Sequence, residues 1–111
     1  MIAQKNRLKK EDFEPIFKEG EKFSNKFFNI RIRGNNLGYC RFAVIVSNKI
    51  SKKAVVRNKI RRRLKAIFLL NLDNFNQDFD ILVTALPAIT ELTFSEIKEN
   101  FLNLAKKKQI L

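Results

Sequence analysis

The chain has 111 residues and a formal net charge of +12, from 23 Lys and Arg against 11 Asp and Glu, and it contains no His. This length and a hydrophobic content of 45% predict one folded domain over residues 1–111 rather than a disordered chain. Without His, and with Cys40 as the only cysteine, we expect no disulfide, no metal site and no catalytic residues of the protein's own.

The N-terminus is basic but lacks the apolar segment of a secretory signal, and no run reaches the roughly 20 apolar residues that cross a membrane. We therefore expect a cytoplasmic protein in which residues 1–8 form a basic, partly flexible arm. Residues 11–19 have the pattern of a short helix that stops at Gly20, and Pro15 fits only within its first turn. Phe13 and Phe17 share one face of this helix, and the spacing by itself favours core packing.

Two strands are predicted next. Residues 27–33 alternate between an apolar face and a polar face that carries Asn29, Arg31 and Arg33. A turn of hairpin character follows at residues 35–38. Residues 41–47 are apolar on both faces, which suggests a central strand.

Residues 54–70, AVVRNKIRRRLKAIFLL, predict the main helix of the chain. On a period of 3.6 residues its apolar side chains form one stripe, and most of its cations lie on the opposite half. A helix of this kind buries one side in a core and presents the other to a negatively charged partner.

The same helix lies in a stretch without acids. From Lys22 to Leu72 the chain has no Asp or Glu, but this stretch holds 14 of the 23 Lys and Arg residues. Cations gathered in this way repel one another unless a polyanion neutralises them, so phosphate groups are the expected partner. A solvated basic face without a partner is the simpler alternative, and the length of the acid-free stretch argues against it.

Residues 79–85 predict a third strand, which Pro87 ends. Asp78 and Asp80, at its start, are two residues apart, and a solvated strand entry explains them as well as a pair of acids does. Thr93 and Glu96 have the spacing of a capping box, so a helix is expected to begin at or near Thr93. The predicted class is α+β, a two-layer sandwich of a small sheet and helices, and its strand–helix–strand unit would ordinarily cross over right-handedly.

The segment Arg41 to Phe68 resembles the signature of the bacterial ribonuclease P protein subunit. In that family a strand ending in a V-S-K-K-like sequence leads to a helix with an R-N-R-like core, which reads Arg57-Asn58-Lys59 here. The opening NRLKKEDFEPIFKEG is also similar to the family's, and the resemblance runs from about Asn6 to the last helix. It implies a four-stranded sheet with three helices in the order α-β-β-β-α-β-α and a left-handed crossover, against the general rule.

The resemblance also implies a function. The family protein supports a tRNA-processing endoribonuclease, a hydrolase whose RNA subunit removes the 5′ leader of precursor tRNA with magnesium. The protein itself carries no cofactor, and its implied partners are ribonuclease P RNA and precursor tRNA, with neither DNA nor a membrane.

The family's roles transfer to matching positions. The residues implied to bind the RNA subunit are Arg57, Asn58, Lys59, Arg61, Arg62 and Lys65. The residues implied to bind the leader are Phe13, Phe17, Arg31, Lys49, Arg57, Asn58 and Arg61. For the two Phe residues this implies partial exposure. Some relatives have an aromatic residue at the position of Arg31, which suggests a phosphate or guanidinium-plane contact instead, and Lys59 keeps the charge of the commoner Arg without its planar fork.

Two other functions fit parts of the pattern. A ribosomal protein on a similar sheet would share the charge and the fold class, but it has no need of the strand-to-helix signature. A nuclease that acts alone would need an acid–base pair or a metal cluster, and the sequence shows neither.

Overall fold

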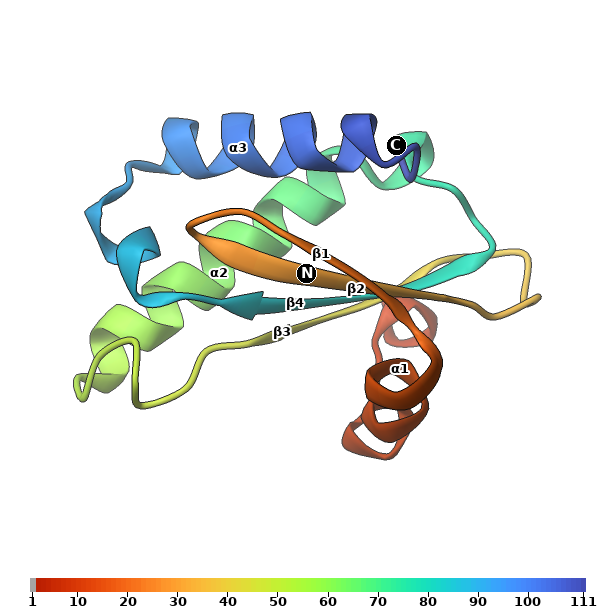
Figure 1. Cartoon of the computed structure of the whole chain (residues 1–111), viewed down its shortest axis with the longest axis horizontal. Coiled ribbons are helices and arrows are strands. Elements are labelled where there is room, and N and C mark those ends of the chain that lie inside the picture. Colours follow the sequence, from red (N-terminus) through yellow and green to blue (C-terminus); the bar gives the residue numbers. More distant parts are fainter. Residues whose placement is uncertain (1) are drawn as a thin grey trace.

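The computed structural model describes residues 2–111, in which three α-helices pack on one four-stranded sheet (Figure 1). The order α-β-β-β-α-β-α and the α+β class agree with expectation. The elements are α1 (Phe13–Glu19), β1 (Glu21–Ser24), β2 (Phe28–Gly34), β3 (Arg41–Ile45), α2 (Ala54–Leu70), β4 (Phe79–Ala85) and α3 (Phe94–Lys107).

The sheet has the strand order β1-β2-β4-β3, so the last strand of the chain lies between the second and the third. β4 pairs antiparallel with β2 and parallel with β3. The turn at residues 35–38 is therefore not a hairpin, because β4 separates the two strands that it connects. The central position expected for residues 41–47 is also wrong, because β3 lies at an edge. The left hand of the β3–α2–β4 crossover stays a prediction.

The N-terminal arm covers part of the open edge of β3, and its Leu8 belongs, with Ile16 of α1, to the cluster on which Ala43 and Ile45 of β3 pack. The Leu8 N–H donates to the Phe42 carbonyl at 3.0 Å, and Arg7 and Phe42 form an isolated parallel bridge. The buried side chain of Asn6 donates to the Cys40 carbonyl at 2.7 Å. These contacts cover the beginning of the β3 edge, while the flexibility of the arm stays a prediction.

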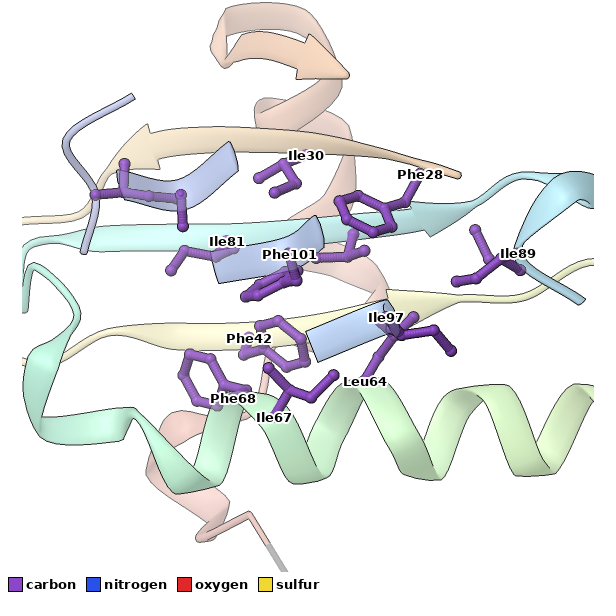
Figure 2. Close-up of a cluster of buried hydrophobic side chains, with 14 of the residues drawn as sticks. Phe28, Ile30, Phe42, Leu64, Ile67, Phe68, Ile81, Ile89, Ile97 and Phe101 are labelled. Atoms are coloured by element: carbon purple, nitrogen blue, oxygen red, sulfur yellow. The ribbon is translucent and has the colours of Figure 1, made fainter. Parts of the chain in front are cut away.

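The main core lies between one face of the sheet and helices α2 and α3 (Figure 2). Phe42 of β3 and Phe68 of α2 stack with their ring centroids 4.1 Å apart, and Phe28 of β2 and Phe101 of α3 lie 5.7 Å apart. None of these four side chains is more than 1% exposed. The apolar stripe predicted for α2 is thus confirmed, and the opposite side of the helix is left for other contacts.

Helix α1 lies on the second face of the sheet, near one end (Figure 1), where Ile16 packs on Leu82. Pro15 lies within its first turn, as expected. The end of α1 approaches β2 so closely that only glycine fits: a Cβ on Gly20 would overlap the Ile16 carbonyl oxygen and lie 2.9 Å from that of Ile32. Strand β1, which the residue pattern did not reveal, begins directly after this glycine.

Asp80 proves to be a structural residue rather than a solvated one, since its side chain is only 2% exposed. Arg41 donates to its two carboxylate oxygens at 2.8 and 2.7 Å, and Asn35 donates to one of them at 2.8 Å. The hydrogen bond to Asp80 raises the pKa of Arg41, so this guanidinium stays charged. The network joins the start of β4 to β3 and to the loop before β3.

The capping box at α3 is confirmed. The Thr93 hydroxyl accepts from the Glu96 N–H at 3.2 Å, and the Glu96 carboxylate accepts from the Thr93 N–H at 2.9 Å. Of the helices formed by residues 2–111, none has the length and apolar character that a membrane crossing requires.

Candidate nucleic-acid interface

The outer side of α2 carries cations that no acid neutralises. The exposed cations are Lys59, Arg62 and Lys65, and the neutral Asn58 is exposed beside them. Within the described residues, no carboxylate forms an ion pair with any cation of this helix. Their mutual repulsion is therefore not relieved inside the protein, which is the condition expected of a surface that binds a polyanion.

Arg57 and Arg61 occupy a different side of α2, facing the loop after β3, and are half-buried. Arg57 donates to the Ser51 carbonyl at 2.9 Å. Arg61 donates to the Asn58 side-chain oxygen at 2.5 Å and makes a long contact of 3.5 Å with the Val46 carbonyl. These bonds hold both guanidinium groups beside the end of the sheet.

The first turn of α2 adds to this positive field. The helix begins after Lys53, whose side chain makes no capping hydrogen bond, and its first turn contains no acid. Cations at this end oppose the helix dipole, which costs about a few tenths of a kcal/mol each. An anion bound at this end would interact favourably with both the dipole and the side chains.

A second surface lies between α1 and the sheet, where Phe17 and Arg31 meet. Phe17 is 45% exposed, and the Arg31 guanidinium carbon lies 4.6 Å from the centroid of its ring. Phe13 is half-buried and packs against the cluster around Ile16 and Leu82. The expected partial exposure is thus confirmed for both Phe residues, and Phe17 is the more accessible.

The strand register extends this surface away from α1. Beyond Arg31, the same face of the sheet presents Asn29, Thr84 and Ile45, which are neighbours in register and all half-buried. The Thr84 hydroxyl oxygen is buried and has no hydrogen-bond partner among the described residues. We call Arg31, Asn29, Thr84 and Ile45 the open strip. It leads from Phe17 toward Val46, where Arg61 approaches the sheet.

The predicted leader residues therefore form two groups rather than one compact site. Phe13, Phe17 and Arg31 lie at α1. Lys49, Arg57, Asn58 and Arg61 lie in the loop after β3 and at the start of α2, toward the other end of the sheet (Figure 1). The open strip joins the two groups, and of its members only Arg31 was predicted from the sequence to bind the leader.

Lys22 is a further cation on this face that the sequence did not single out. It pairs in register with Arg31, so its side chain lies on the same face of the sheet, and it is exposed. Only the position of β1 reveals this, because four residues are too few for a clear alternation. In residues 2–111, no three Cys, Asp or Glu side chains are arranged so that they could hold a metal ion.

Comparison with known proteins points to one family. The family model described as Ribonuclease P matches residues 2–109. The ribonuclease P protein component of Clostridioides difficile is 36% identical over 105 residues, which cover 93% of this chain and 91% of that protein.

Solved structures agree. The RNase P protein of Thermotoga maritima superposes with a TM-score of 0.84 at 35% identity, covering 91% of this chain and 96% of that one. The RNase P protein of Staphylococcus aureus gives a TM-score of 0.87 at 27% identity, covering 95% of this chain and 96% of that one. The resemblance seen in the sequence is thereby confirmed, and the ribosomal alternative loses its support.

Proposed function

This chain belongs to the ribonuclease P protein family, and we propose that it binds the catalytic RNA of that enzyme together with the 5′ leader of precursor tRNA. Through these two contacts it supports removal of the leader in tRNA 5′ maturation, in the cytoplasm. The RNA subunit supplies the hydrolytic chemistry with its magnesium ions, while the protein binds and orients and carries no cofactor. The observation that carries the proposal is the un-neutralised cationic side of α2.

Docking on the RNA subunit is assigned to α2. The exposed side chains of Asn58, Lys59, Arg62 and Lys65 face outward and can reach phosphates without any rearrangement of the core. Arg57 and Arg61 are partly engaged with backbone carbonyls, so their guanidinium groups are oriented before RNA arrives. Preorientation lowers the side-chain entropy that each phosphate contact has to overcome.

The leader is assigned to the open strip between Phe17 and the start of α2. Phe17 offers an exposed ring on which an unpaired base can stack without a sequence requirement. Arg31 lies over that ring and Lys22 is its register neighbour on β1, so both add positive charge at this end of the strip. Lys49, Arg57 and Arg61 then border the exit toward the RNA subunit.

The experiment that tests this function is cleavage of precursor tRNA by a bacterial ribonuclease P RNA at low magnesium, with and without the protein. The cations of α2 should reduce repulsion between the two RNAs, so the protein should restore cleavage at the correct 5′ end. If magnesium dependence were identical in both reactions, the proposed function would be wrong.

A salt titration identifies the docking surface in the same system. Arg62→Ala should remove one phosphate contact and flatten the slope of log affinity against log salt by roughly 0.7 to 0.9. Lys98→Ala, which removes an exposed cation from α3, is the matched control and should leave the slope unchanged. Equal slopes for all three proteins would move the docking surface away from α2.

A further inference from the structure

A groove of about 690 Å³ lies where the N-terminal arm, β3 and α2 meet. Its walls are largely apolar, and Leu8, Phe13 and Leu69 are among the side chains that form them. Arg7, Arg62 and Lys65 also line it, and no acid does. The groove is separate from the open strip: it lies along the β3 edge, and neither Phe17 nor Arg31 belongs to its lining.

The lining indicates the chemistry of an occupant. The volume is within the range of pockets that hold small organic groups, roughly 300–1,000 Å³. Apolar walls accept a flat, uncharged ring system, and the half-buried ring of Phe13 offers a face for stacking. Arg62 and Lys65 are exposed and pair with no carboxylate in residues 2–111, so they remain available to an anion attached to that ring. A nucleotide has both features, because its base is a flat, uncharged ring and its phosphate is an anion.

We propose that this groove holds one unstacked base of the catalytic RNA, with the adjoining phosphate on Arg62 and Lys65. The inference rests on the proposed function and adds a specific nucleotide site to the docking surface. The base has to come from a bulge, loop or end, because a base within a helix is stacked and cannot enter.

An extended peptide added to the β3 edge is the competing occupant. The arm already uses this edge, since the Leu8 N–H occupies the Phe42 carbonyl. Three cations without an acid also match phosphate rather than an ordinary peptide. The groove is therefore assigned to RNA, and a peptide occupant is an outcome that the test can detect.

The test fills the groove without changing any charge. Ala66 lines the groove from α2 and is half-buried, so Ala66→Phe places a ring in the space assigned to the base. Asn103→Phe adds the same ring on an exposed position of α3 and serves as the control. Affinity for the full-length RNA subunit is measured for both, together with dimethyl sulfate reactivity of unpaired RNA bases.

Wild type and Asn103→Phe should protect the same unpaired base, and Ala66→Phe should restore its reactivity. Affinity should fall by about 5- to 100-fold for Ala66→Phe, the range of one lost base-stacking contact. Circular dichroism tests whether each variant is folded. Ala66→Leu is measured in parallel and should show a smaller loss of protection at the same base, so the test holds even if Ala66→Phe does not fold.

The outcomes separate the two proposals. If wild type neither binds nor activates the RNA subunit, the proposed function fails. If wild type does both, and the folded Ala66 variants match it in affinity and in protected bases, only the groove proposal is overturned. That second result is also the one expected if a peptide occupies the groove.

Discussion

Replacing Asp80 by Asn should destabilise the fold although it changes few atoms. Asp80 is buried at the start of the central strand and accepts three hydrogen bonds, two from Arg41 and one from Asn35. In Asp80→Asn the new amide group can still accept through its oxygen. Its nitrogen, however, is a donor that faces a donor of Arg41, and the charge of the guanidinium loses its counterion.

The magnitude follows from the burial of each partner. Removing one member of a buried ion pair costs about 3–5 kcal/mol. The Arg41 side chain is 23% exposed and has Asp12 at 3.6 Å as a second acid, so water and Asp12 compensate part of the loss. We therefore expect a decrease of about 2–3 kcal/mol in the free energy of unfolding, which lowers Tm by about 8–12 °C at this chain length.

Urea denaturation followed by circular dichroism measures this change. Asp78→Asn is the matched control, because Asp78 is exposed two residues earlier and should shift the free energy of unfolding by less than about 0.5 kcal/mol. A double-mutant cycle with Arg41→Met should give a coupling above about 1 kcal/mol. If Asp80→Asn proved no more destabilising than Asp78→Asn, the ion pair would contribute nothing and our reasoning would be refuted.

Three further outcomes are expected. Gly20→Ala should lower the free energy of unfolding by about 1–3 kcal/mol, because its Cβ overlaps the Ile16 carbonyl oxygen, whereas Gly34→Ala, where a Cβ meets nothing within 4 Å, should not. Urea midpoints of the two variants decide this, and equal midpoints would contradict it.

The hydrogen bond from the Thr93 backbone N–H, together with the Thr93 side chain, lowers the pKa of Glu96 from its ordinary value. Its contribution to stability is therefore present above the unfolded-state pKa and is lost as pH falls through the folded-state pKa. Wild type should then lose more stability than Glu96→Gln between about pH 5 and pH 3 in thermal melts, and parallel pH curves would argue against the cap. Phe17→Ala should weaken binding of precursor tRNA by about 5- to 100-fold and mature tRNA little, as gel-shift titrations can show, and equal losses would remove Phe17 from the leader path.

Local patterns in the sequence predicted the helices well. The apolar stripe with a period of 3.6 residues, with cations on the opposite half, located α2 at residues 54–70. The Thr93–Glu96 spacing located the start of α3. Both signals depend on residues at most four positions apart, so they can be recognised in the sequence without knowing the fold. Strand β1 was not predicted because it has only four residues, of which only Phe23 is buried, so it shows no clear alternation.

Strand neighbours and partners across the fold could not be predicted in this way. Period-two alternation tells which face a side chain occupies but not which strand lies beside it. Residues 41–47 therefore looked like a central strand, although they form an edge strand whose second face packs on the cluster of Leu8, Ile16 and Leu82. Asp80 looked solvated because its partner Arg41 is 39 positions away. The groove depends on an arm, a strand and a helix meeting, and no single segment contains it.

The position of β4 at the centre of the sheet has a consequence for synthesis on the ribosome. β2 and β3 do not pair with each other, because β4 lies between them, and β4 begins 34 residues after β3 ends. At about 5–20 residues per second, the nascent chain spends roughly 2–7 seconds with these strand edges unpaired, and the cations of α2 are added to it during that time. During that interval the emerging chain faces ribosomal RNA with its charge and without its fold, and the arrival of β4 ends the exposure.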